Sequence, residues 1–338
     1  MKRIISLVCG CLILVIIAFP FFSVSKNSAS EIFEVIEQQF NTSDISNGVE
    51  SVPNYVDGYQ QQLKERMGEE LYIEYLEADP ASWLEEDPTT GELKIVTPNV
   101  PDWVDLSTEP YIPEEVEIAD EFISSQNLYT SSEIEYPVSN SYPYCTNAFL
   151  EITFQDGSTG TASGVFVKDD VVLTAGHNIY QHGLGYATQV LVTPSGIPSK
   201  FETSTKKSLQ TTLGWERDKN RNYDYGVIKL NKSLGTGYLG MKNTSDSYLN
   251  NITLLGIYGF PGNVSRGLLW YSSGSLTDFD NEIIYHDAIS YRGNSGSPVV
   301  DMADYKNVIG IHILDTNLGY AAVRMRNPII EFVNKYGK

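Results

Sequence analysis

Short apolar runs separated by turn residues dominate the chain from residue 148 onward. Nine runs of four to seven residues are separated by Gly, Asn and Asp, as at Asp156-Gly157. Many short strands between turns favour an antiparallel barrel or sandwich over βαβ units. We therefore expect an all-β body, with one helix at 328–336 and a site built from loops. The expected strands are 148–154, 163–167, 171–174, 189–192, 225–230, 252–258, 297–300, 308–314 and 320–325.

Charge divides the 338 residues into three parts. The net charge is −20, but residues 31–140 carry 26 acidic side chains against three basic ones, whereas residues 141–338 carry 17 of each. This acidic balance excludes phosphate-driven binding of nucleic acid, which needs Lys and Arg to displace counterions. A hydrophobic content of 41%, with 22 Tyr and 13 Phe, excludes a disordered chain. A leader, an acidic segment and a neutral body follow from these numbers.

The leader has the pattern of a secretory signal. Lys2 and Arg3 precede an apolar run over 4–22, and small residues at 23–25 and 28–30 are candidate cleavage sites. The run is long enough to span a bilayer if it is never cut, so an uncleaved anchor is the alternative, and only then do we expect contact with a membrane. Two of the three Cys lie in this run. Cys145 would then be alone in the exported chain, and we expect it to pack as a small hydrophobe.

The acidic segment begins with two expected helices, at 31–40 and 60–76. In the second, Leu63, Met67, Leu71 and Tyr75 recur every four residues on one face. Beyond Asp79, repeated prolines predict irregular structure. Three interpretations are open for this segment: a pro-region, a solvated stalk or a partner-binding domain.

Three short passages in the body supply the groups of a nucleophilic site. His177 follows one expected strand, Asp224 opens another, and Ser295 lies in the turn Gly293-Asn294-Ser295-Gly296. A serine nucleophile needs a base to take its proton and an acid to orient that base. The two glycines allow backbone angles that let the amides of Gly293 and Ser295 form an oxyanion hole. We predict a His177, Asp224, Ser295 triad, with no cofactor and no metal site.

The motifs around these residues resemble those of the chymotrypsin-fold serine proteases, and among them the bacterial glutamyl endopeptidases of the staphylococcal type. The resemblance covers roughly residues 146–336. It rests on Ala162-Ser163-Gly164-Val165, Thr174-Ala175-Gly176-His177, Tyr223-Asp224-Tyr225, Gly259-Phe260-Pro261-Gly262, Gly293-Asn294-Ser295-Gly296-Ser297-Pro298 and Val308-Ile309-Gly310-Ile311-His312. It implies two six-stranded antiparallel β-barrels with the site in the cleft between them. It also implies a precursor with a signal at 1–30, a partly helical pro-region at 31–135 and a protease domain at 136–338.

The same resemblance implies a pocket for a substrate carboxylate. His312 and Ser290 match the positions that meet the substrate's Glu, and an imidazole and a hydroxyl can hydrogen-bond a carboxylate. Arg292 stands where the relatives have a small residue. It could point outward, narrow the pocket, or add a positive charge for an acidic side chain. His182 and His286 are interpreted as structural or surface residues.

Processing is expected in the span 120–140. In the family, the α-amino group released by cleavage completes the pocket. Glu121, Glu133 and Glu135 are possible self-cleavage points, and a thermolysin-like partner protease is the alternative.

These features predict a bacterial endopeptidase that is secreted as a zymogen and works as a monomer. It would cleave proteins or peptides with acidic residues, after Glu and less readily after Asp. One alternative is a protease with the same triad and another narrow specificity, as in relatives resembling exfoliative toxins. The other is a binding protein that keeps an inert protease fold.

Overall fold

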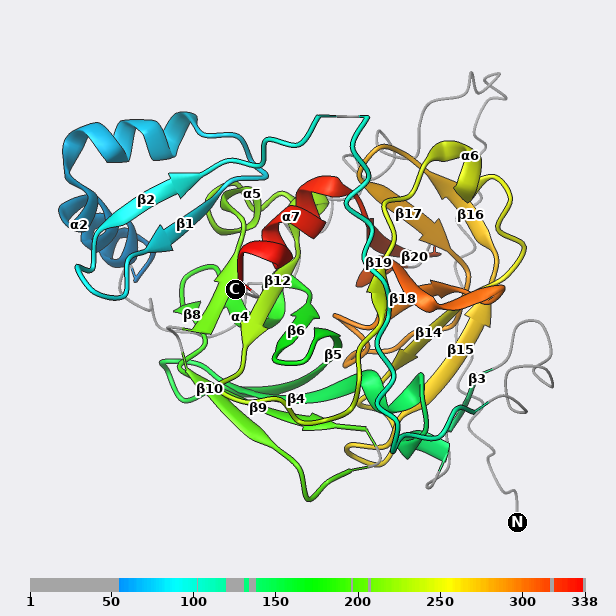
Figure 1. Cartoon of the computed structure of the whole chain (residues 1–338). Coiled ribbons are helices and arrows are strands. Elements are labelled where there is room, and N and C mark those ends of the chain that lie inside the picture. The colour runs from blue at the N-terminus through cyan, green and yellow to red at the C-terminus, as the bar shows by residue number, and fades with distance from the viewer. Residues whose placement is uncertain are drawn as a thin grey trace, which may run out of the picture. The chain divides into compact units, whose positions relative to one another are not determined.

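The computed structural model describes residues 55–101, 103–119, 131–133, 138–195, 197–205, 208–316 and 319–336 (Figure 1). Residues 52–338 form one compact unit. The leader, the helix expected at 31–40, the boundary between 135 and 136, Glu121 and Glu135 all lie outside the described residues. Among the helices described, none is long and apolar enough to cross a membrane.

The acidic segment contains a kinked helix and a hairpin. Helix α2 spans Tyr55–Glu77 and is interrupted at Gly68, whose φ is 74°. Its predicted apolar face is confirmed, since Leu63 and Tyr75 are buried and the two residues between them on that face are half-buried. The prediction of irregular structure after Asp79 was wrong for 83–96, although it holds for the described residues of 97–119. Strands β1 (Trp83–Glu86) and β2 (Leu93–Val96) pair there as an antiparallel hairpin.

The turn of this hairpin explains why its two strands form although prolines predicted irregular structure there. The Asp87 side chain accepts hydrogen bonds from the amides of Thr89 and Thr90 at 2.7 and 2.9 Å. Gly91 follows with a φ of 74°, a conformation that glycine adopts without strain. Turn chemistry of this kind allows two strands to pair across a proline-containing loop.

The first barrel is an antiparallel sheet in the order β10-β9-β4-β5-β6-β12-β11. Its interior is an aliphatic cluster around Leu150, Phe166 and Val190. Its strands are β4 (Asn147–Thr153), β5 (Thr159–Lys168), β6 (Val171–Thr174), β9 (Gln189–Pro194), β10 (Glu202–Thr205), β11 (Leu209–Thr211) and β12 (Gly226–Lys229). The short strands β7 (Tyr180–Gln181) and β8 (Gly185–Tyr186) pair beside it.

The second barrel follows the order β16-β17-β20-β19-β18-β14-β15-β3, with β13 paired in parallel to β19. Its strands are β3 (Ser131–Glu133), β13 (Gly240–Met241), β14 (Leu255–Gly259), β15 (Trp270–Gly274), β16 (Leu276–Phe279), β17 (Ile283–His286), β18 (Pro298–Asp301), β19 (Asp304–Thr316) and β20 (Gly319–Arg324). The predicted two-barrel, all-β architecture is confirmed, and short strands such as β11, β13 and β3 extend the sheets beyond the six strands expected in each.

Short helices fill the connections, and a longer one ends the described chain. They are α4 (Gly176–Ile179), α5 (Leu213–Glu216), α6 (Asp246–Leu249), the 3₁₀ turns Val138–Asn140, Tyr144–Thr146 and Arg221–Tyr223, and α7 (Asn327–Tyr336). The predicted C-terminal helix is confirmed as α7. Its buried Ile330 and Phe332 belong to a core cluster that also contains Leu173 of β6 and Val323 of β20. One apolar core therefore joins the two barrels.

An extended stretch links the hairpin to the body. We call the described residues of 97–119 the strap. It is the cyan trace that passes α7 in Figure 1, and it also contacts residues 230–254, which link the two barrels and which we call the linker. The Leu106 amide donates to Asn327 Oδ1 at 3.0 Å, and Tyr111 forms a β-bridge with Tyr238. Ile118 forms another bridge with Tyr142. The strap is thereby fastened to α7, to the linker and to the start of the first barrel.

Cys145 is the free cysteine of the described chain, and it is buried. Its thiol donates to the Thr236 carbonyl at 3.2 Å. Burial raises the pKa of this thiol to about 12, so it stays protonated at neutral pH. Packing of this kind agrees with the expected role as a small hydrophobe.

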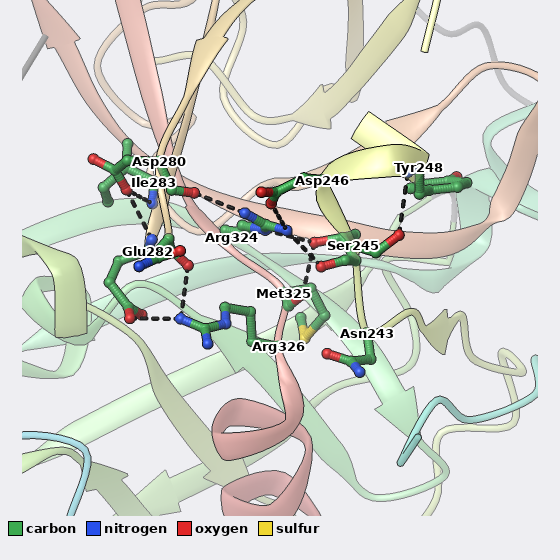
Figure 2. Close-up of polar contacts among 12 residues, drawn as sticks. Asn243, Ser245, Asp246, Tyr248, Asp280, Glu282, Ile283, Arg324, Met325 and Arg326 are labelled. Carbon is green, nitrogen blue, oxygen red and sulfur yellow. Dashed lines mark hydrogen bonds and ion pairs between the residues drawn. The ribbon is translucent and has the colours of Figure 1, made fainter. Parts of the chain in front are cut away.

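A buried arginine ties two segments to strand β20, the stretch at 244–246 and the turn after β16 (Figure 2). The Arg324 guanidinium is 4% exposed and donates to the carbonyls of Thr244 and Asp280 at 2.7 and 2.8 Å. It also pairs with Asp246 at 2.9 Å. Arg326, two residues along, pairs with Glu282 at 2.6 Å but is 34% exposed.

Arg324→Ala should lower the free energy of unfolding by about 3 kcal/mol, because it leaves buried acceptors without donors. Arg326→Ala is the matched control, and it should cost about 1 kcal/mol because its ion pair is partly solvated. Urea unfolding of both variants, in a Ser295→Ala background that lacks the predicted nucleophile, measures the difference. Equal losses would contradict the structural role assigned to Arg324.

Candidate active site

His177 and Asp224 form a pair at the end of the first barrel. His177 lies in α4 directly after β6, and Asp224 lies between the Arg221–Tyr223 turn and β12. Asp224 Oδ2 is 2.7 Å from His177 Nδ1, and Oδ1 accepts the His177 amide at 2.7 Å. An ionised carboxylate can only accept, so Nδ1 carries the proton. This leaves Nε2 of the neutral imidazole as a base.

The environment of His177 favours its protonated form. Burial alone would lower the pKa of His177, but the charge and hydrogen bond of Asp224 outweigh burial and raise it. Arg221 opposes the shift. The side chain remains 31% exposed, so the ring edge is open to an incoming group.

Close packing around Gly176 fixes the pair. A Cβ at Gly176 would lie 2.6 Å from Thr211 Oγ1, 2.9 Å from Trp215 Cδ1 and 3.0 Å from Asp224 Oδ1. The position therefore accepts only glycine without rearrangement. The Trp215 ring lies 6.1 Å from the His177 ring and donates its Nε1 proton to the Tyr180 carbonyl at 3.1 Å.

His182 packs on the other side of Trp215, with ring centroids 5.1 Å apart. Burial, aided by the charge of Lys219, lowers the pKa of His182 to about 4. The ring is therefore neutral at pH 7 and half-buried among aromatic rings, which agrees with the structural interpretation of this residue.

The Ser295 turn is held by both barrels. Its carbonyl accepts the Ser163 amide at 3.0 Å and the Asn178 side-chain amide at 2.9 Å. Asn178 is the residue next to His177, so these bonds bring the Ser295 main chain to the His177–Asp224 pair. Gly296 has a φ of 88°, and a Cβ there would lie 2.1 Å from the Ser163 carbonyl. Only glycine allows the turn to approach this closely.

The peptide before Gly293 is oriented by the loop after β14. Arg292 O accepts the Gly262 amide at 2.6 Å, and Gly293 has a φ of 101°. The C=O and N–H of a trans peptide point in opposite directions, so the Gly293 N–H faces away from Gly262. Among the described residues, no backbone oxygen accepts the amides of Gly293 or Ser295. This arrangement leaves both donors available for the oxyanion hole that the sequence predicts.

Ser163 is a site residue that the sequence reasoning did not single out. Its hydroxyl donates to the Gly293 carbonyl at 2.7 Å and accepts the Phe260 amide at 2.9 Å. It is fully buried in β5 of the first barrel, yet both partners belong to the second. Its place in the Ala162–Val165 motif was the available signal, because a serine inside an apolar strand needs hydrogen-bond partners.

Ser290 and His312 meet in a buried pair. Ser290 Oγ lies 2.8 Å from His312 Nε2, and the Asn294 side chain donates to Ser290 Oγ at 3.4 Å. His312 Nδ1 lies 3.3 Å from Nε2 of His286, which is fully buried in β17. Burial, aided by His312, lowers the pKa of His286 well below its usual value, so that ring is neutral. The sequence assigned His286 no role toward the pocket, and its contact with His312 crosses strands that lie far apart in the chain.

Arg292 is exposed. Of the three possibilities that the sequence left open, this agrees with a side chain that points outward. Its backbone nevertheless belongs to the turn that carries Gly293, and its carbonyl accepts the Gly262 amide. Within the described part of the chain, no group of three or more His, Cys, Asp or Glu side chains is placed to hold a metal ion.

Comparisons with known proteins agree with this geometry. Residues 162–311 match the model of the trypsin-like peptidase domain. The glutamyl endopeptidase of Bacillus licheniformis is 32% identical over 171 residues, which cover 49% of this chain and 52% of that protein. The glutamyl endopeptidase of Staphylococcus aureus strain MW2 is 28% identical over 172 residues, covering 46% and 48%. This chain is similar to the glutamyl endopeptidases.

Two further comparisons bear on the relatives and the fold. A Bacillus subtilis protein described as an extracellular metalloprotease is 30% identical over 180 residues, covering 52% of this chain and 57% of that protein. The structure of a Glu endopeptidase in complex with MPD aligns with a TM-score of 0.52 and 23% identity, over 61% of this chain and 95% of that one. The chain thus spans about half the length of the curated relatives and has the fold of the structural one. Together these matches support a serine endopeptidase of the chymotrypsin fold that resembles the glutamyl endopeptidases.

The raised pKa of His177 makes a prediction about pH. Labelling of Ser295 by a fluorophosphonate, which carries no acidic side chain, needs neutral His177, so the rate should fall as the pH drops through an apparent pKa above about 6.5. Asp224→Asn should slow labelling by about 10⁴-fold and move this acidic limb to lower pH. Asp169→Asn, which changes an exposed carboxylate, is the control. An Asp224→Asn protein with the parent's rate and profile would remove Asp224 from the site.

Proposed function

We propose that the chain is a secreted serine endopeptidase that cleaves peptide bonds after Glu, and less readily after Asp. The observation that carries this proposal is the His177–Asp224 pair at 2.7 Å, beside a Ser295 turn that Asn178 and Ser163 hold in place. This arrangement supports a site in which base, orienting acid and nucleophile act together, as acyl transfer requires.

In the proposed reaction, Ser295 Oγ attacks the substrate carbonyl while its proton passes to His177 Nε2. Asp224 holds the tautomer and stabilises the imidazolium. The amides of Gly293 and Ser295 donate to the oxyanion of the tetrahedral intermediate. His177 returns the proton to the leaving amine, and the C–N bond breaks to give an acyl-enzyme. Water activated by His177 then attacks the ester, and Ser295 regains its proton.

Substrate choice is proposed to depend on Ser290 and His312. Their 2.8 Å contact is buried, and a Glu carboxylate at this place would find a hydroxyl and an imidazole within one small region. Neutral His286 can donate its Nε2 proton to His312 Nδ1, which would leave the Nε2–H of His312 to donate to the substrate carboxylate. Arg292 would supply a positive charge for a further acidic residue of the substrate.

Export and activation by cleavage belong to the same proposal. The leader pattern supports export, and the Bacillus subtilis relative is described as extracellular. We propose that the chain is made as a precursor and is cut between Ala119 and Val138. Glu133 in that span fits the enzyme's own preference, and a partner protease is the other route.

Ser295→Ala should abolish peptide hydrolysis and fluorophosphonate labelling, since the variant has no nucleophile. We expect a loss of about 10⁶-fold in turnover. Ser297→Ala, which changes a buried serine two residues away, should keep labelling and serves as the control. A correctly folded parent that is not labelled at Ser295 would favour an inert protease-fold binding protein.

Profiling of a peptide mixture by the processed protein tests specificity. Cuts are expected after Glu, with Glu preferred over its neutral isostere Gln. His312→Ala should reduce this preference by about 10–100-fold, the loss of one hydrogen bond to a charged group. His182→Ala should leave the ratio unchanged. Cuts by the parent after Lys, Leu or Phe would reject the Glu pocket and favour a different narrow specificity.

A further inference from the structure

The acidic segment completes helix α5 of the body. The first N–H groups of a helix have no acceptor within the helix. In α5, the Leu213 amide donates to the Ser82 carbonyl and the Gly214 amide to the Pro80 carbonyl, both at 2.7 Å. The next amide, of Trp215, donates to Thr212 Oγ1 at 3.2 Å. Two of the three caps of α5 therefore come from the acidic segment.

The body in turn completes the end of α2. Arg217 follows α5 directly, and its guanidinium donates to the carbonyls of Tyr75 and Ala78. A cation at the carboxyl end of a helix is favourable, because the last carbonyls have no partner within the helix. Each partner thus supplies the groups that the other's helix end lacks.

Apolar contact accompanies these caps. Trp83 of β1 is fully buried, with its ring 5.2 Å from that of Phe332 in α7. Leu213 of α5 packs in one cluster with Leu63, Tyr75 and Leu84 of the acidic segment. Release of the segment would expose these side chains to water, at a free-energy cost of about 25 cal/mol per Å² of apolar surface.

The body is shaped to receive the strap. A Cβ at Gly237 would lie 2.4 Å from the Tyr111 carbonyl and 2.7 Å from Pro113 Cδ, and one at Gly240 would lie 2.3 Å from the Thr108 carbonyl. The strap therefore packs closely against two residues of the linker that have no side chain. The Thr108 amide donates to the Met241 carbonyl at 2.9 Å in the same stretch.

Charge contributes little to this contact. In the described part of the acidic segment, the ion pairs Arg66–Glu86 and Lys94–Glu85 are internal. The contacts with the body are hydrogen bonds of backbone and neutral side-chain groups, the bonds of the charged Arg217 and Glu331, and buried apolar side chains. Salt screens exposed charges but leaves such contacts largely intact.

We propose that residues 61–119 stay bound to the body after the chain is cut between Ala119 and Val138, as a non-covalent part of the working enzyme. This inference rests on the proposed function, because it takes the processed chain to be an active enzyme. The segment holds α5, and α5 presents Trp215 to His177. Cleavage then breaks the chain without removing the segment.

A nicked protein tests this directly. In full-length Ser295→Ala protein, the recognition sequence of a site-specific viral protease replaces residues 123–128, and the cut chain is passed through gel filtration at about 0.15 M and about 1 M NaCl. Both fragments should elute together at both salt concentrations. Separate elution at low salt would overturn the proposal, and separation only at high salt would overturn its apolar basis.

Two glycine variants test whether the strap packs against the linker at Gly237. Gly237→Ala places a methyl group against the strap, and the nicked variant should release the fragment at lower urea than the parent. Gly235→Ala is the matched control. Its φ of 67° is close to the 70° of Gly237, but its Cβ would meet only Lys200 Nζ, at 3.5 Å. Equal release from both variants would contradict the proposed packing.

Labelling separates this inference from the proposed function. In nicked protein that keeps Ser295, fluorophosphonate labelling should be lost over the same urea range as the fragment. Labelling that persists after release would overturn the segment's part in the working enzyme. An absence of labelling while the fragments co-elute would instead overturn the proposed function, because co-elution of the Ser295→Ala protein needs no activity.

Discussion

The hydrogen bonds of Ser163 hold the two barrels in register at the site. Its amide bonds the Ser295 carbonyl, and its hydroxyl bonds Gly293 and Phe260, so one buried residue of the first barrel positions two segments of the second, the turn at 293–296 and the loop after β14. The residue is small enough to let the Gly296 turn lie against its carbonyl. This contact fixes the position of the Ser295 turn relative to the first barrel. Asn178 of α4 bonds the same Ser295 carbonyl, and this places the neighbouring His177 beside the turn.

Two layers of support surround this contact. Inside, Asp224 and Trp215 set the position and charge of His177, and their packing tolerates only glycine at position 176. Outside, the acidic segment caps α5, which carries Trp215. The net charge of −20 is therefore misleading about how the segment is attached. In the described part of the segment, the carboxylates are exposed except for half-buried Glu85, which pairs with Lys94, while backbone groups and apolar side chains hold the segment to the body.

Most of the body was predictable from local pattern. The strand at 171–174 and the helix near 328–336 have strong periodicity, and the Gly293–Pro298 string carries the backbone requirements of a tight turn. What failed depends on distant partners. The hairpin after Asp79 needs the turn chemistry of Asp87, and α5 is too short to show periodicity. Ser163 and His286 looked ordinary in sequence, because their partners lie 97 to 130 and 26 residues away.

The strap also has a consequence for the order in which the molecule can be assembled. Leu106 is bound by Asn327, which follows it by 221 residues, and α5 must form before α2 can be capped. During synthesis from the amino end, the acidic segment is exposed long before the surface of the body that it packs against has formed. High charge keeps such a waiting segment soluble. Its many carboxylates then matter most during synthesis, before any of its final contacts has formed.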